Sequence, residues 1–136
     1  MLIKIIFLLT INIITANQFS HIDDLKWKNR VLIISNDELN VLKMIEFHKE
    51  GFDERDFIII YVKAKDVFID HKKSSKSFTK SVLKKIQIAS EEDDIILIGK
   101  DGNIKKYYSS NIKVESIFFN VDQMPMRKNE VRNKNK

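Results

Sequence analysis

The sequence predicts a single α/β domain whose four strands form a mixed sheet flanked by helices. Three observations indicate this fold class. Two short β-branched segments enclose a stretch of helical spacing, a second pair of strands surrounds an Asp-Gly turn, and 43% of the 136 residues are apolar. That apolar share, with only three glycines and one proline, is typical of a folded core and excludes a disordered or collagen-like chain.

The first sixteen residues have the pattern of a secretory signal peptide. Lys4 supplies a positive charge, an apolar run follows over residues 5–14, and the small residue Ala16 precedes the polar Asn17. A transmembrane helix needs about twenty apolar residues, and this run is only about half that length. We expect cleavage after Ala16 and export to the periplasm or the medium. An uncleaved anchor or a buried first strand are the alternatives.

The next segments predict a right-handed β-α-β unit. Residues 30–35 (RVLIIS) and 56–62 (DFIIIYV) are apolar on both faces, as strands covered by helices are. Between them, Asn36 and Asp37 offer N-cap oxygens to a helix with an apolar stripe. Gly51 is expected to end that helix in the left-handed conformation.

The second half predicts a helix, a hairpin and a final helix. After a lysine-rich loop, serines at 74–77 cap a helix that carries Phe78 and Val82. Residues 94–99 and 104–108 then form antiparallel strands around Asp101-Gly102. A last helix over residues 114–121 is closed by Pro125, and residues 127–136 are expected to be a basic, disordered tail. This order, β-α-β-α-β-β-α, is that of the thioredoxin fold, here over residues 17–126.

Composition excludes several kinds of chemistry. The chain has no cysteine, so it can form no disulfide, thiolate nucleophile or thiolate zinc site. A formal net charge of +5 with mixed signs gives no one-sided basic field, and we expect no nucleic-acid partner. Acidic groups at 36–38 and 91–94 offer a conceivable Ca²⁺ site, but a helix cap beside a solvated turn is the favoured interpretation because no calcium-loop spacing is present. We expect no metal, no cofactor and no catalytic residue.

Charged and aromatic residues from four separate segments are predicted to meet at one end of the sheet, which we call the charged pole. Strand directions place the beginnings of the first two strands, the hairpin turn and the end of the last helix together. Its members are Trp27, Arg30, Arg55, Asp56, Lys100, Asp101, Asp122 and Arg127. They could line a pocket for an anion or a partner, or they could form a structural network of ion pairs. In a structural network, Arg55 is expected to matter more than Arg127, which borders the tail.

Four motifs carry a resemblance to a known family. They are DDLKWKNRVLII at residues 23–34, ERD at 54–56, LIGKDGNIK at 97–105 and DQMPMRKNE at 122–130. Together they resemble the domain-of-unknown-function family DUF4174. The resemblance implies a thioredoxin-like fold, an exported protein, and a similarity to the peroxiredoxin-like domain of animal sushi-repeat and coiled-coil-domain matrix proteins. It implies no catalytic residue.

These observations favour an exported, cysteine-free binding or adaptor module without redox activity. Its partner is expected to be a protein or a small anionic ligand, and no stable membrane insertion is expected after cleavage. A peroxiredoxin-like enzyme with non-thiol chemistry and a purely structural protein are the alternatives.

Signal processing gives the first testable prediction. Protein recovered from the periplasm or medium should begin at or near Asn17, because the apolar run is of signal length and polar residues follow it. Intact-mass measurement checks this. An exported, membrane-embedded species that keeps Met1 would contradict it.

Overall fold

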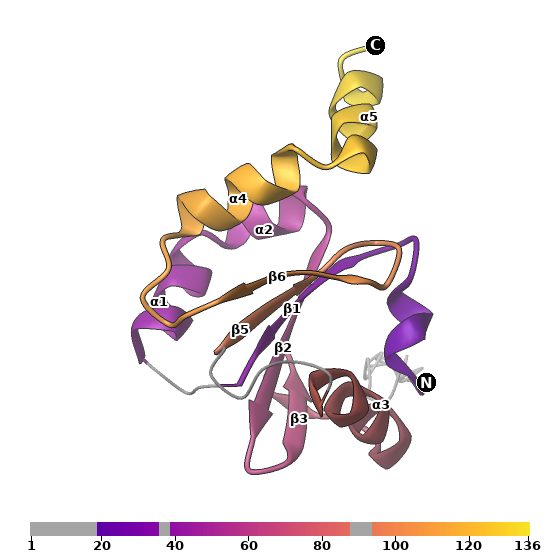
Figure 1. The fold of residues 1–136 in the computed structure, drawn as a ribbon, viewed down its shortest axis with the longest axis vertical. Helices are drawn as coiled ribbons and strands as arrows, with labels where there is room; N and C mark the ends of the chain where they lie inside the picture. The colour runs from indigo at the N-terminus through magenta and orange to yellow at the C-terminus, as the bar shows by residue number, and fades with distance from the viewer. Residues whose placement is uncertain (1–18, 36–38, 88–93) are drawn as a thin grey trace, which may run out of the picture.

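The computed structural model describes residues 19–35, 39–87 and 94–136 (Figure 1). These residues form a mixed α/β structure whose elements are, in order, η1 (Ile22–Leu25), β1 (Arg30–Ile34), α1 (Leu39–Phe47), α2 (Lys49–Glu54), β2 (Phe57–Lys63), β3 (Asp66–Ile69), β4 (Lys72–Lys73), α3 (Lys76–Gln87), β5 (Ile95–Ile98), β6 (Ile104–Tyr108), α4 (Val114–Asp122) and α5 (Pro125–Lys134).

The strands form one six-stranded mixed sheet in the order β4-β3-β2-β1-β5-β6. β1 and β2 are parallel, with Leu32 opposite Ile59, whereas β1 and β5 are antiparallel, with Leu32 opposite Leu97. β6 pairs antiparallel with β5. The predicted parallel pair and the predicted antiparallel hairpin are both confirmed.

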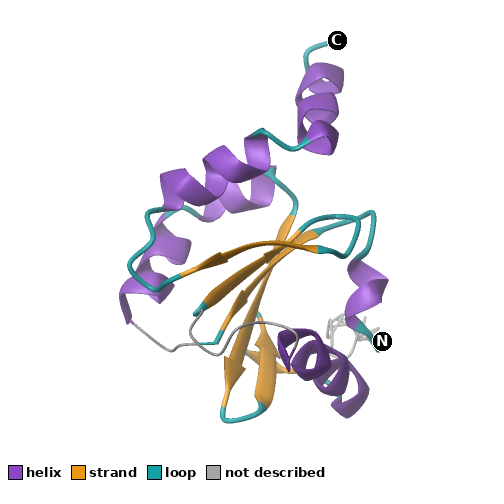
Figure 2. Cartoon of the chain, in the orientation of Figure 1, coloured by secondary structure: helices purple, strands orange, loops and turns teal. Residues whose placement is uncertain are grey.

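Helices cover both faces of the sheet, as Figure 2 shows. Because successive strand residues point to opposite faces, Leu32 and Ile34 of β1 pack with the layer formed by α1, α2 and α4. Val31 and Ile33 pack instead with α3 and η1. β1 is therefore buried along its whole length, as its apolar sequence predicts.

The predicted number of four strands is wrong, because β3 and β4 occupy the segment expected to be a lysine-rich loop. Two-residue turns connect these strands, and both central residues of each turn have positive φ: Ala64 and Lys65, then Asp70 and His71. These are the backbone angles of a type I′ hairpin, which usually contains Asn-Gly or Asp-Gly. Ala-Lys and Asp-His give no such signal.

Gly51 does not end its helix, contrary to expectation. It lies inside α2, which continues to Glu54. A Cβ atom at this position would lie 2.6 Å from Cε2 of Phe118, so the glycine permits a close approach between α2 and α4. The left-handed glycine of the described chain is Gly102, in the β5–β6 turn, at φ 80°.

The C-terminal segment is not the disordered tail that its composition predicts. α4 ends at Asp122, and Pro125 begins α5 rather than closing a helix. Proline suits the first helical position because the N–H it lacks there would have no intrahelical partner.

Several expectations fall on residues outside the described ranges. They are the signal peptide, the Asn36 and Asp37 caps, and all of the acidic groups at 36–38 and 91–94 except Asp94. In the described ranges no helix has the length and apolar character that a membrane crossing requires.

Candidate functional site

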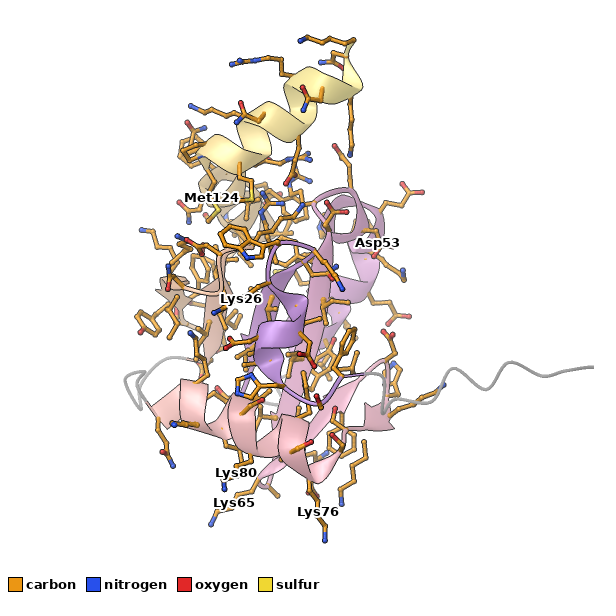
Figure 3. The ribbon with its side chains drawn as sticks, turned by 90° about the vertical axis from the view of Figure 1, so that its right-hand side faces the viewer. Lys26, Asp53, Lys65, Lys76, Lys80 and Met124 are labelled. Carbon is orange, nitrogen blue, oxygen red and sulfur yellow. The ribbon has the colours of Figure 1, made fainter. Side chains whose placement is uncertain are left out.

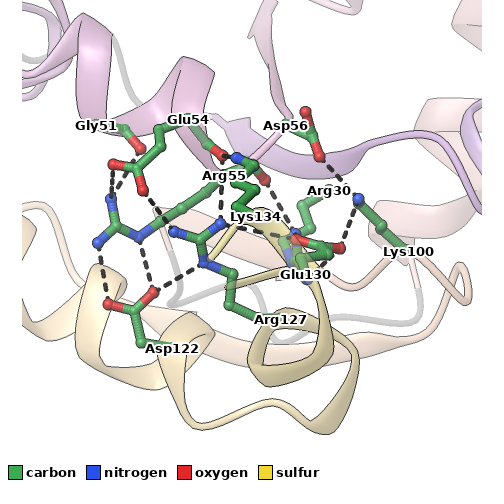
Figure 4. A network of polar contacts seen from close by, with 10 residues as sticks. All are labelled: Arg30, Gly51, Glu54, Arg55, Asp56, Lys100, Asp122, Arg127, Glu130 and Lys134. Atoms are coloured by element: carbon green, nitrogen blue, oxygen red, sulfur yellow. Dashed lines mark hydrogen bonds and ion pairs between the residues drawn. The ribbon is translucent and has the colours of Figure 1, made fainter. Parts of the chain in front are cut away.

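The charged pole forms where β1 and β2 begin, beside the β5–β6 turn and the helices α2, α4 and α5 (Figure 4). Backbone hydrogen bonds bring the segments of the pole together at this end of the sheet. The N–H of Arg30 donates to the carbonyl of Asp56 at 2.9 Å, and the N–H of Trp27 donates to that of Lys100 at 2.7 Å. Three chain segments are thus held together at the edge where the charged side chains project.

Arg30 is the most buried charge of the pole. Only 1% of its surface is exposed, although it is the first residue of β1. Its two terminal nitrogens donate to the two carboxylate oxygens of Glu130 at 3.1 and 3.2 Å, and Nη1 also donates to the carbonyl of Arg55 at 3.0 Å. This two-point contact joins the first strand to the last helix across 100 residues.

Lys100 extends this pair into a chain of charges. From the β5–β6 turn, its Nζ lies 2.6 Å from Oε1 of Glu130 and 2.8 Å from Oδ2 of Asp56. Its side chain is only 9% exposed, so both contacts lie in a partly dehydrated site. Glu130 therefore receives hydrogen bonds from two cations at once.

Arg55 makes the second two-point pair. Its Nε and Nη2 donate to the carboxylate of Asp122 at 3.0 and 2.9 Å, and Nη1 donates to the carbonyl of Gly51. Its guanidinium carbon also lies 4.1 Å from the ring centre of Phe118, a cation–π contact. Arg55 thereby fastens α4 onto the end of α2.

Arg127 links the two pairs from the first turns of α5. Its Nε donates to Asp122 at 3.3 Å, its Nη2 donates to Glu54 at 2.8 Å, and its Nη1 lies 3.8 Å from Glu130. Its side chain is only 3% exposed. The residue expected to border a disordered tail is one of the most buried charges in the described chain.

The charges of this pole balance internally. The four cations Arg30, Arg55, Lys100 and Arg127 face the four carboxylates Glu54, Asp56, Asp122 and Glu130. Each guanidinium is bonded within the network, so the arrangement is a closed set of ion pairs and not an open cationic cleft.

The carboxyl groups respond to these neighbours. Hydrogen bonds from Arg55 lower the pKa of Asp122 from its ordinary value. Burial raises the pKa of Glu130, but the hydrogen bonds from Arg30 and Lys100 outweigh that effect and leave the pKa lowered. Both groups are thus held in the charged state that the network requires.

Six of the eight predicted pole residues join the network, and two do not. Asp101 accepts from Lys105 at 2.7 Å and from the N–H of Asn103, so it stabilises its own turn. Trp27 contributes a backbone hydrogen bond, while its residue surface is 67% exposed. The sequence analysis missed Glu54, Glu130 and Lys134, whose Nζ lies 3.5 Å from the carbonyl of Glu54. The i, i+3 spacing of Arg127 and Glu130 was the available signal.

The other end of the sheet carries an apolar hollow of about 290 Å³. It lies where β1 and β2 finish, and its lining residues are Ile34, Leu42, Tyr61, Val62, Lys63, Phe68 and His71. Among the described residues, no group of three or more His, Asp or Glu side chains is arranged to hold a metal ion.

Arginine removal tests how strongly the network holds the helices. We expect Arg55→Ala and Arg127→Ala each to lower the free energy of unfolding by about 2 to 4 kcal/mol, because each removal leaves carboxylates without their partner, although partial exposure of Asp122 and Glu54 limits the cost. The burial of Arg127 removes the reason to expect the smaller loss there. Urea denaturation measures both. Arg132→Ala, on the exposed side of α5, is the matched control and should change stability by less than about 0.5 kcal/mol.

Acid should weaken the same contacts. Because the pKa values of Asp122 and Glu130 are lowered in the folded protein, their contribution is present above the ordinary carboxyl pKa of about 4 and is lost as pH falls through the folded values. We expect the urea midpoint to fall steadily between about pH 5 and pH 2. The double variant Asp122→Asn, Glu130→Gln should show a shallower fall, and an unchanged slope would contradict this role.

Comparison with known proteins gives a family without an assigned activity. The family model described as "Domain of unknown function (DUF4174)" matches residues 21–130, which include every member of the network except Lys134. No curated protein and no solved structure matches. Because the match covers most of the chain, this protein belongs to the DUF4174 family.

Proposed function

We propose that this protein is an exported binding module of thioredoxin-like topology that has no redox activity and engages a partner protein through Trp27. The four strands β2-β1-β5-β6 support the topology, since β1 and β2 are parallel while β5 and β6 run antiparallel to their neighbours. The order of these strands and of the helices between them along the chain supports this part of the proposal, and β3 and β4 extend one edge of the sheet.

Sequence chemistry argues against catalysis of the thioredoxin or peroxiredoxin kind. Both need a thiolate, and the chain contains no cysteine. The apolar hollow at the far end of the sheet offers Tyr61, whose pKa is raised by burial, so its phenol stays neutral at physiological pH. A neutral phenol in an apolar lining supports a non-thiol enzyme less well than a binding role.

While α5 is in place, the closed charge network leaves none of the three arginines free to bind a ligand. A small anion would have to displace carboxylates that already occupy the guanidinium groups of Arg30, Arg55 and Arg127. These residues favour the structural interpretation of the charged pole. Partner binding is then left to side chains at this end that project into solvent.

Trp27 is the observation that carries the proposal. It is the chain's single tryptophan, its surface is 67% exposed, and its backbone has φ 67°. A bulky residue in the left-handed region costs about 1 to 3 kcal/mol of backbone strain. Because the indole is mostly exposed, its burial within the folded chain offsets little of that strain. Tryptophan is among the residues most enriched at the centres of protein interfaces. A fixed, exposed tryptophan of this kind is suited to anchor a partner protein.

A substitution to glycine separates an anchor from a structural residue. Because glycine adopts positive φ without strain, Trp27→Gly should leave the urea midpoint unchanged or raise it, while a purely structural tryptophan would give a clear loss. The same variant should lose a partner that the wild-type chain retains from the exported fraction. Phe47→Ala is the control, because Phe47 is 85% exposed on α1 and should keep the partner.

The single tryptophan also reports on binding directly. Titration of the purified partner should shift the Trp27 emission to shorter wavelength as the indole leaves water. Retention of the partner by Trp27→Gly, or an unshifted emission at saturation, would refute the proposed anchor.

A further inference from the structure

We propose that Arg30 and Lys100 form a carboxylate-binding site that α5 occupies as an exchangeable ligand, so that a glutamate-bearing segment of another polypeptide can take the place of Glu130. This inference goes beyond the proposed function and does not depend on Trp27. It rests on three features: how the residues that face Glu130 are positioned, what charge they keep without Glu130, and the absence of a buried apolar side chain in α5.

The residues that face Glu130 are positioned without any contribution from α5. Arg30 is fixed at the start of β1 by its backbone bond to Asp56 and by donation from Nη1 to the carbonyl of Arg55 at 3.0 Å. Lys100 is fixed at the β5–β6 turn, where its Nζ lies 2.8 Å from Asp56. Both cations would therefore keep their positions if Glu130 left.

This site carries excess positive charge when Glu130 is removed. Lys100 then keeps the carboxylate of Asp56, which is 48% exposed, whereas the guanidinium of Arg30 keeps only the carbonyl of Arg55. Nε of Arg30 is buried and has no hydrogen-bond partner in the described structure, so the guanidinium already has fewer bonds than it can make. A guanidinium that has lost its carboxylate partner favours binding of a replacement anion.

α5 itself is held by charge rather than by apolar packing. Within its residues 125–134 the one buried side chain is Arg127, whereas Met126 and Val131 are 37% and 40% exposed. Figures 1 and 3 show the helix continuing beyond Met124 away from the sheet. Arg127 and Glu130 are thus charged groups through which a mostly solvent-facing helix contacts the body of the protein, and Glu130 is the one that reaches Arg30 and Lys100.

The geometry selects a carboxylate as the ligand class. Both oxygens of Glu130 face both terminal nitrogens of Arg30, a planar two-point match that chloride cannot make. Lys100 then approaches one of those oxygens at 2.6 Å. A side-chain carboxylate presented by a polypeptide fits this arrangement, because the natural occupant is one.

Rescue by a small carboxylate tests the site in the full-length chain. In Glu130→Ala, sodium acetate should raise the urea midpoint in a saturable way, with half-saturation on the order of 10 mM, relative to sodium chloride at equal ionic strength. The wild-type chain and Glu115→Ala, an exposed glutamate of α4, should show no such difference. Adding Lys100→Met to Glu130→Ala should abolish the response.

Four outcomes of this experiment decide the proposal. A selective acetate effect supports a carboxylate site, and folding of Glu130→Ala only in acetate supports it equally. An equal effect of phosphate at the same ionic strength would overturn the selectivity for carboxylates. Equal effects of acetate and chloride would overturn the site itself.

Exchange with another polypeptide needs a second measurement. A synthetic peptide of residues 125–136 should bind full-length Glu130→Ala at least about tenfold more tightly than it binds the wild-type chain, where the tethered α5 competes. The same peptide carrying Glu130→Gln should bind at least about tenfold more weakly, because it lacks the charge. Calorimetric titration measures each affinity. If Glu130→Ala fails to fold in either salt, full-length Glu130→Gln replaces it, and equal affinities for the two peptides would then overturn the proposal.

Discussion

The buried guanidinium of Arg30 is the constraint on which the end of this fold depends. A charge that is 1% exposed at the first position of a central strand is strongly unfavourable unless a counter-charge reaches it, and that counter-charge comes from Glu130, 100 residues later. The last helix, which buries no apolar side chain within the described residues 125–134, is ordered because this pairing and the contacts of Arg127 hold it. The chain's two distant segments are joined by electrostatics, while its interior is joined by apolar layers.

Those two kinds of contact fall on different parts of the sheet for a structural reason. The middle of β1 is covered on both faces, so Val31, Leu32 and Ile33 meet only apolar neighbours. The beginning of the strand lies at the rim, where helix ends and turns bring backbone carbonyls and carboxylates near Arg30. Gly51 allows α2 and α4 to approach closely enough for Arg55 to reach Asp122. The network is therefore a consequence of how tightly the helical layer packs.

Periodicity predicted the elements that apolar burial creates, and it failed where burial is not the cause. β1, β2, β5 and α4 carry strong apolar patterns, and the structure contains them at nearly the expected residues, while β6 was expected from the Asp101-Gly102 turn. β3 and β4 were missed because Ala64-Lys65 and Asp70-His71 make I′ turns without glycine or asparagine. α5 was missed because the composition of residues 127–136 is that of a solvated tail. The helix is held by contacts of Arg127 and Glu130 with residues that are remote in sequence. Strand direction predicted that the charges would meet at one end of the sheet. It could not predict that Arg30 would pair with Glu130 and not with Asp101.

One end of this protein thus combines a charge network that is closed with an aromatic side chain that is open. The guanidinium groups of the arginines are all paired with carboxylates of the network, so removal of an arginine is expected to act mainly on the stability of the fold. Trp27, held beside them by a backbone hydrogen bond to Lys100, has the opposite character. Its backbone is strained, its ring is exposed, and its side chain contributes little to the stability of the fold. Lys100 connects the two, since its carbonyl accepts from Trp27 and its ammonium group binds Glu130. Any event that removed Glu130 from this lysine would therefore act on the turn that positions the tryptophan, which gives the C-terminal helix a physical route to influence the surface proposed for the partner.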